Sequence, residues 1–535
     1  MTPSGENFVK FDVVIVEAGF AGMYMLHKCR QLGLSTRVFE VGKGVGGTWY
    51  WNRYPGARCD VESVQYSYQF DAELEQEWTW SEKYSTQPEI LRYANHVADR
   101  FDLRDDIQFE TRVISAQYSE ANKLWVLETD RNEKASSRYC VFATGCLSSS
   151  NVPQFEGFET FKGLSYHTGR WPHEGVDFSG LRVGVIGTGS SAIQSIPEIA
   201  KEARQLTVFQ RTANYTIPAR NSKLTEDYIS SIKADYPGLR ERARNKPAGY
   251  DIPLNPKSVL EVGREDANNE FQRRWKLGGT QFLGAYGDLL LNPYANEVAA
   301  DFVKSKIREI VSDPEIAELL CPTNIIGCKR LCVDTDYYAT YNRKNVQLVD
   351  VSRKSIDRIT PKGILHGDKE YEFDAIVFAT GFDAMTGALA NIEIVGKGGS
   401  VLAEKWQDGP QTYLGLTSNG FPNMFMITGP GSPSVLTNML PSIEQHVNFI
   451  SECISYMTEH NFSIIEPDRE AEIDWGLHVN EVAALSLRST CESWYVGANV
   501  PGKPRVFSPY IGGFPKYVER CEQVVGNNYE GFTLV

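Results

Sequence analysis

The sequence predicts an α/β protein with two Rossmann-like domains and a helical insertion. Two glycine-rich turns support this prediction, at residues 17–22 and 187–192, and each stands between an apolar strand and a helix. Two later strands that end in Ala-Thr-Gly, at residues 143–145 and 379–381, follow one turn each. A chain of 535 residues is also too long for one hydrophobic core, so more than one domain is expected.

The first turn belongs to a strand–helix–strand unit that spans residues 11–40. Gly19 and Gly22 would let the backbone approach a pyrophosphate at the helix N-terminus, and Glu40 ends the second strand, where an acid binds a ribose hydroxyl. Glu17 departs from this pattern. The first glycine of G-x-G-x-x-G usually stands there, and a carboxylate would repel the pyrophosphate.

The second turn is intact, with Gly187, Gly189 and Ala192, an accepted replacement for the third glycine. Its following strand ends in Arg211 instead of an acid, which suits the 2′-phosphate of NADP, although Arg211 alone could be an ordinary surface arginine. The strands expected in the two units are 11–16, 36–39, 182–186 and 206–209, with helices that reach about residues 32 and 203.

Two dinucleotide units imply two nucleotides, and the simplest pair is a bound flavin with a reducing nicotinamide. Strands ending in Ala-Thr-Gly return the chain beneath each nucleotide in two-dinucleotide flavoproteins, and this sequence has one after each unit. The sequence therefore predicts FAD and NADPH as cofactors.

Charge and cysteine content exclude several other classes. The net charge of −14, without a run of Lys or Arg, disfavours nucleic acid and anionic membranes as partners. The segment 1–10 is polar and lacks the apolar core of a signal peptide. Ten scattered cysteines with no C-x-x-C pair indicate reduced thiols in a cytoplasmic protein and no metal site.

Four further patterns carry a family resemblance. Residues 161–172 (FKGLSYHTGRWP) resemble the Baeyer–Villiger monooxygenase fingerprint, and residues 46–60 (GGTWYWNRYPGARCD), 329–338 and 493–503 resemble further family patterns. Together with both nucleotide units they span nearly the whole chain in the order typical of type I Baeyer–Villiger monooxygenases. We expect His167, inside the fingerprint, to be a linker residue and not an acid or base.

The resemblance implies an FAD domain built from both chain ends, an inserted NADP domain and a helical insertion. The expected bounds are 1–148 and 385–535 for the FAD domain, 149–221 and 323–384 for the NADP domain, and 222–322 for the insertion. Inside the insertion, Val298, Phe302, Ile307 and Ile310-Val311 approximate a helical stripe.

The resemblance also implies the reaction and its residues. NADPH would reduce the flavin, O2 would add to form a C4a-peroxyflavin, and a ketone would become an ester or lactone, without an obligate protein partner. Arg330 would keep the peroxide anionic and Asp60 would position Arg330. Besides Gly19, Gly22 and Glu40, the implied FAD contacts are Thr48, Trp49, Asp60, Tyr66, Val113 and Met439. The implied NADP contacts are Gly187, Thr188, Gly189, Ser190, Gln194, Arg211, Thr212, Lys329, Arg330 and Trp494.

Several alternatives remain open at this stage. A flavin monooxygenase that oxidises nitrogen or sulfur shares the fold and cofactors, but usually lacks the Trp171-Pro172 ending of the fingerprint. Glu17 supports a second alternative, an NADPH-binding variant with impaired FAD binding. Trp494 could belong to a mobile lid or to the buried core. The length of segment 429–439 resembles that of the phenylacetone and steroid type, which implies a broad range of ketones that includes bulky or aromatic ones.

Overall fold

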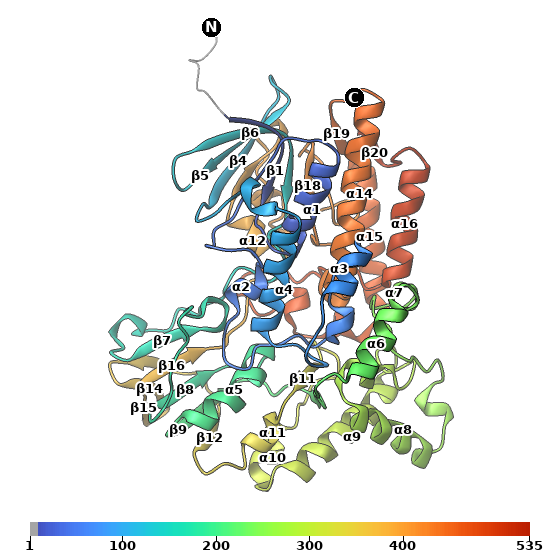
Figure 1. The fold of residues 1–535 in the computed structure, drawn as a ribbon. Helices are drawn as coiled ribbons and strands as arrows, with labels where there is room; N and C mark the ends of the chain where they lie inside the picture. Colours follow the sequence, from blue (N-terminus) through green and yellow to red (C-terminus); the bar gives the residue numbers. More distant parts are fainter. Residues whose placement is uncertain (1–8) are drawn as a thin grey trace.

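The computed structural model describes residues 9–535 (Figure 1). The chain forms two larger sheets, named here the β1 sheet and the β8 sheet after their first strands, with a group of helices beside them. The polar segment 1–8, which contributed to the expectation of no signal peptide, lies outside the described residues. None of the helices in residues 9–535 is long and apolar enough to cross a membrane.

The β1 sheet draws on distant parts of the chain. Its order is β17 (Glu393–Val395), β4 (Val113–Ser119), β5 (Leu124–Thr129), β6 (Lys134–Phe142), β1 (Val9–Val16), β2 (Thr36–Phe39) and β3 (Ile107–Gln108), and β18 (Met424–Met426) also pairs with β6. Strand β1 lies parallel to β2 and β6, and Val13–Val16 are all buried, as expected for a strand covered on both faces.

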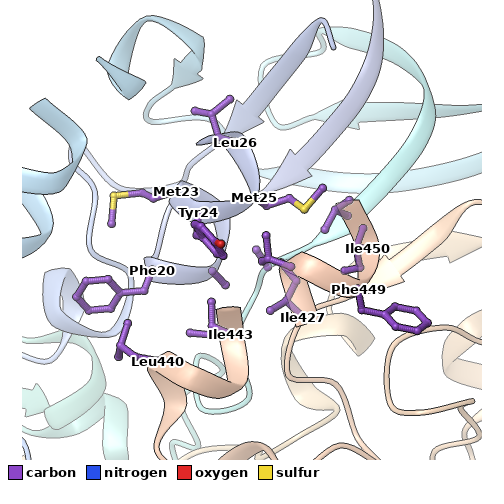
Figure 2. Packing of buried hydrophobic residues seen from close by; sticks show 14 of the residues in the cluster. Phe20, Met23, Tyr24, Met25, Leu26, Ile427, Leu440, Ile443, Phe449 and Ile450 are labelled. Carbon is purple, nitrogen blue, oxygen red and sulfur yellow. The ribbon is translucent and has the colours of Figure 1, made fainter. Parts of the chain in front are cut away.

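Helix α1 (Phe20–Gln31) joins β1 to β2 and packs against α14 (Met439–Glu459). Figure 2 shows side chains of both helices meeting in one buried cluster, among them Tyr24 from α1 and Ile443 from α14. The two ends of the chain therefore complete a single core around the first glycine-rich turn.

The β8 sheet comes from the middle of the chain. Its strands are all parallel, in the order β12 (Val346–Asp350), β9 (Gln205–Gln210), β8 (Arg182–Ile186), β16 (Ala375–Phe378) and β7 (Leu164–His167). Helix α5 (Ser190–Glu202) follows β8 directly. This is the parallel strand–helix–strand arrangement of a Rossmann-like domain that the second turn predicts.

Both Ala-Thr-Gly segments occupy equivalent positions in the two sheets. The Ala143 amide, after β6, donates to the Val16 carbonyl at 3.0 Å, and the Ala379 amide, after β16, donates to the Ile186 carbonyl at 2.9 Å. Each segment thus continues its strand to the point where a glycine-rich turn begins.

The segment between β10 (Thr216–Pro218) and β11 (Cys332–Asp334) is helical, with α6 (Glu226–Ala234), α7 (Tyr236–Arg244), α8 (Arg264–Leu277), α9 (Pro293–Ile310) and α10 (Pro314–Leu320). Phe302 and Ile307 are buried on α9, whereas Val298 is 38% exposed, so its place in the expected stripe is wrong. The buried face runs instead through Ala295 and Ala299, which allow close packing. The domain limits themselves stay a prediction.

The remaining elements surround these layers. They are α2 (Thr48–Trp51), α3 (Ala72–Glu77), α4 (Gln87–Arg100), α11 (Tyr337–Thr340), β13 (Arg358–Thr360), β14 (Gly363–His366), β15 (Lys369–Glu372), α12 (Gly387–Ala390), α13 (Leu402–Lys405), β19 (Ile465–Pro467), α15 (Arg469–Ala484), α16 (Phe514–Gly526) and β20 (Phe532–Leu534). Helices α14, α15 and α16 lie together on one side of the β1 sheet (Figure 1).

Candidate active site

The turn after β1 has the backbone of a nucleotide-binding turn, with a glutamate where glycine is usual. Glu17 has a φ of +80°, in the region that favours glycine. A Cβ on Gly22 would lie 1.9 Å from the Glu17 carbonyl oxygen, so this glycine is required. Gly19 caps α1 without any side-chain hydrogen bond, which leaves first-turn amides available to an anion.

Glu17 and Glu40 form a buried carboxyl pair beside this turn. Glu40 accepts hydrogen bonds from the backbone amides of Ala18 (2.7 Å) and Gly42 (2.6 Å). The Glu17 side chain hydrogen-bonds the Glu40 carboxyl, and burial together with the Glu40 charge raises the pKa of Glu17 well above its usual value. Burial also raises the pKa of Glu40. Two carboxyls in such contact favour a single shared proton.

The aromatic segment 46–60 lies over the first turn. A Cβ on Gly47 would lie 2.9 Å from the Gly19 Cα, so the two backbones touch. Trp49 donates from Nε1 to the Tyr66 hydroxyl at 3.1 Å, and their rings meet edge to face. Thr48 begins α2 in the same segment. Val113 is buried at the start of β4, and Met439 begins α14. These contacts provide an aromatic wall and a close-packed cradle that fit a flavin dinucleotide.

The turn after β8 has a glycine at the position that Glu17 occupies in the first turn. Gly187 has a φ of +112°, and a Cβ there would lie 2.4 Å from the Ala379 carbonyl oxygen. Gly189 caps α5 without a side-chain hydrogen bond, as Gly19 caps α1. Thr188 donates from Oγ1 to the Thr212 carbonyl at 2.8 Å, which joins the turn to the residues after β9.

Helix α5 also contacts the segment that covers the first turn. Gln194 donates from Nε2 to the Arg58 carbonyl at 3.0 Å and accepts from the Tyr54 hydroxyl at 2.9 Å. Ser190, at the start of the helix, lies 3.1 Å from the Cys332 sulfur. Helix α5 is therefore joined by side-chain hydrogen bonds to the segment that covers the first turn.

A cavity of about 550 Å³ opens beside the second turn. Arg211, Thr212 and Lys329 line it, together with Cys328 and Cys491. The pKa of Lys329 is lowered, chiefly by burial and also by the nearby Arg211 charge. Two cations that face one cavity make a suitable site for a phosphate, so this donor set fits the 2′-phosphate of NADP.

Arg330 lies where several distant segments meet. It donates to Asp60 from Nε and from Nη2, both at 2.7 Å, and from Nη1 to the Val435 carbonyl at 3.0 Å. The Asp60 carboxylate raises the pKa of Arg330 well above its usual value. Three of the five guanidinium N–H groups are used in this way, and the side chain is 33% exposed, so the others can bind a further oxygen.

Three contacts of Arg330 were not anticipated from the sequence. The Val435 carbonyl belongs to the short helix η8 (Ser434–Leu436), inside segment 429–439. Tyr250, from the helical insertion, and Tyr495, from the C-terminal segment, lie close enough to interact with its charge. Only the tertiary structure reveals these neighbours, since nothing in the local sequence marks them.

Two other residues singled out in the sequence, Trp494 and His167, pack against neighbouring residues. Trp494 begins the short helix η10 (Trp494–Val496), is half-buried and packs on Tyr495 with ring centroids 4.2 Å apart. His167 accepts from the Gly169 amide at 3.0 Å, and burial lowers its pKa to about 4, so it is neutral near pH 7. That His167 is a linker residue, and not an acid or base, stays a prediction.

Known proteins resemble this chain along its whole length. The family model for flavin-binding monooxygenase-like proteins matches residues 10–227. A phenazine N-monooxygenase of Lysobacter antibioticus is 42% identical over 98% of this chain and 97% of that protein. A Baeyer–Villiger monooxygenase of Pseudooceanicola batsensis is 41% identical over 97% and 95%. The solved structure of an oxidised steroid monooxygenase bound to NADP is 51% identical, covers 98% of this chain and 100% of that one, and superimposes with a TM-score of 0.94.

The two nucleotide turns, the Arg330–Asp60 pair and this full-length similarity agree with one another. The expected cofactors, FAD and NADPH, are those of the family. The chain belongs to the type I Baeyer–Villiger monooxygenases, FAD- and NADPH-dependent enzymes that use O2 to convert ketones into esters or lactones.

Proposed function

We propose that Arg330, positioned by Asp60, binds the negative charge that develops on oxygen while this chain converts a ketone into an ester or lactone. When bound, FAD and NADPH supply the redox chemistry that activates O2. Arginine stays protonated at physiological pH, and the bidentate contact with Asp60 fixes the direction in which its free N–H groups point. This contact is the observation that carries the proposal.

The proposal assigns the surrounding residues to the two nucleotides. For FAD these are Gly19, Gly22, Glu40, Thr48, Trp49, Asp60, Tyr66, Val113 and Met439. For NADP they are Gly187, Thr188, Gly189, Ser190, Gln194, Arg211, Thr212, Lys329, Arg330 and Trp494. The close glycine contacts at both turns and the paired cations of the cavity support this assignment.

The ketone would bind against the apolar cluster next to Arg330. Met385, Val435, Tyr495 and Phe507 are buried there in one cluster, and the Val435 carbonyl contacts the guanidinium directly. An apolar wall with one charged group suits a bulky cyclic or aromatic ketone. The 51% identity to a steroid monooxygenase supports the same substrate class.

We further propose that the protein acts in the cytoplasm on the ketone and O2 as small-molecule partners. All ten cysteines are free, which suits a reducing compartment. The expectation that no protein partner is required stays a prediction.

The decisive experiment separates flavin reduction from oxygen insertion in Arg330→Ala. Ketone oxygenation should fall at least about 100-fold, since a preorganised charged donor is removed, while anaerobic reduction of FAD by NADPH persists. Arg182→Ala is the matched control, because Arg182 also pairs with a carboxylate, Asp374, but lies at the far end of β8 from the turn. Equal loss of reduction and oxygenation would contradict the role of Arg330.

The substrate class is tested by offering phenylacetone, cyclohexanone and a thioether together, followed by product analysis. An ester or lactone as the main product supports the proposal. Since a relative of 42% identity is named an N-monooxygenase, an amine is included. Exclusive sulfoxide or N-oxide formation would favour the nitrogen/sulfur oxygenase instead.

A further inference from the structure

Two thiols with no role in the proposed reaction lie together in the cavity beside the second turn. Cys328 directly precedes Lys329, and Cys491 follows the short helix η9 (Leu487–Thr490) in the C-terminal segment. Both line the cavity that Arg211 and Lys329 also line. Although 163 positions separate them, the two thiols lie close enough for each to shift the pKa of the other. The Cys491 thiol also donates to the Leu487 carbonyl at 3.6 Å.

Neighbouring contacts hold the two thiols in place. Arg488 donates from Nε to the Gly327 carbonyl at 3.0 Å, which fastens the C-terminal segment to the loop that carries Cys328. The Leu487 amide donates to the Leu290 carbonyl at 2.9 Å. The segment that precedes Cys491 is therefore held next to the loop of Cys328 by hydrogen bonds that do not involve the thiols.

Cys328 is chemically distinct from the other cysteines. Its pKa is lowered, first by the interaction with the Cys491 thiol and also by the positive charges of Lys329 and Arg488. The pKa of each of the other nine cysteines is raised, in most cases by burial. A thiolate is the reactive form of cysteine, so Cys328 is the expected nucleophile.

We propose that Cys328 and Cys491 form a reversible intrachain disulfide when the protein meets hydrogen peroxide. The Cys328 thiolate attacks one peroxide oxygen, the O–O bond breaks, and the leaving hydroxide takes a proton to become water. The Cys491 thiol then loses its proton, its sulfur attacks the Cys328 sulfur, and the S–O bond breaks to release a second water. Two thiols lose two electrons and one peroxide gains them, and an external dithiol reverses the reaction.

The disulfide would join two segments that both line the cavity. One carries Lys329 and the other leads to Trp494, residues that the proposed function assigns to NADP. A covalent link would limit their separation and slow the entry and release of the nucleotide. This consequence rests on the proposed function, whereas formation of the disulfide does not.

The first test treats the FAD-loaded protein with hydrogen peroxide, blocks the remaining thiols with N-ethylmaleimide and maps the peptides by mass spectrometry. The expected product is a cross-linked pair of peptides that contain Cys328 and Cys491, lighter by two hydrogen atoms and restored by dithiothreitol. In Cys491→Ser, Cys328 should stop at the sulfenic acid and react with dimedone. Cys332→Ser is the control and should cross-link normally, because Cys332 contacts Ser190 instead. Blocked thiols at both positions, or a different cross-link, would overturn the proposal.

The second test measures the release of NADP⁺ before and after oxidation. Oxidised protein should release it at least about fivefold more slowly, and peroxide should not change the rate in Cys491→Ser. Normal ketone oxidation without a cross-link overturns the disulfide and leaves the proposed function intact. A cross-link without any change in release confirms the disulfide and overturns its effect on the nucleotide.

Discussion

The turn after β1 and the turn after β8 meet the same backbone requirement with different residues. Glu17 at φ +80° and Gly187 at φ +112° occupy equivalent positions, each directly after its strand. At Gly187 a Cβ would meet the Ala379 carbonyl at 2.4 Å, whereas the Glu17 side chain has a partner in Glu40. The backbone conformation is therefore the same in both turns. The turns differ in the space available to a side chain and in the carboxyl pair, which only the first turn has beside it.

The largest effect is expected when the second turn receives the glutamate of the first turn at the equivalent position. Gly187→Glu should weaken NADP⁺ binding at least about 1000-fold, because backbone strain, crowding and repulsion of the phosphates add together. Equilibrium binding and the thermal unfolding midpoint measure the change. Gly180→Glu is the control, since Gly180 also has a positive φ but has open space around it. Similar losses of NADP⁺ affinity in both variants would show that crowding at Gly187 does not determine nucleotide binding.

The second test concerns the residues that follow each unit, Glu40 in one and Arg211 in the other. Arg211→Ala should weaken NADPH binding about 100-fold, as expected for the loss of charge-assisted hydrogen bonds to a phosphate, and leave NADH binding unchanged. Titrations with both nucleotides provide the measurement. Lys201→Ala, which removes a cation from the exposed end of α5, should change neither affinity. An equal effect on NADPH and NADH would remove Arg211 from the 2′-phosphate site.

The third test restores glycine to the first turn. Glu17→Gly should tighten FAD binding about fivefold, since it removes about 1 kcal/mol of backbone strain from the turn that would hold the pyrophosphate. Glu17→Gln keeps the strain, and it leaves one negative charge on Glu40 because the pair shares a single proton, so its FAD affinity should stay close to that of the unchanged protein. Flavin fluorescence on titration of the apo-protein gives both values. Unchanged affinity in Glu17→Gly would show that the turn tolerates the side chain.

The smallest expected effect is a pH dependence confined to the first turn. Because the pKa of Glu17 is raised in the folded chain, the folded state binds more protons than the unfolded state above the usual carboxyl pKa. Stability is therefore fully present at low pH and is lost as pH rises through the raised pKa. From pH 5 to pH 8, the unfolding midpoint of the apo-protein should fall about 2 °C more than that of Glu17→Gly. Parallel profiles would exclude proton uptake at Glu17.

Local patterns were sufficient for the elements around both turns. Strands β2 and β8 have the predicted bounds of 36–39 and 182–186, and α1 and α5 end at Gln31 and Glu202, one residue before the expected positions. Apolar runs and glycines determine such elements within a few residues of sequence. The two glycine-rich turns were therefore recognisable without any tertiary information.

Long-range contacts could not be predicted in the same way. The pairing of Glu17 with Glu40, and the Val435 carbonyl on Arg330, depend on how distant strands and loops are packed. The contact between Cys328 and Cys491 likewise joins segments that carry no shared pattern. Val298 was predicted to be buried from its helical spacing alone, but it is exposed, because an apolar residue at that spacing can still lie on the outer side of a helix.

The β1 sheet contains strands from both halves of the chain, so it cannot be completed early during synthesis. The β8 sheet needs nothing beyond β16, which ends at Phe378, so its strands can assemble while later residues are still on the ribosome. Strand β6 must wait for β18, and α1 must wait for α14, which ends at Glu459. The first segment to leave the ribosome is thus among the last to be completed, and its apolar surface is a natural target for chaperones until then.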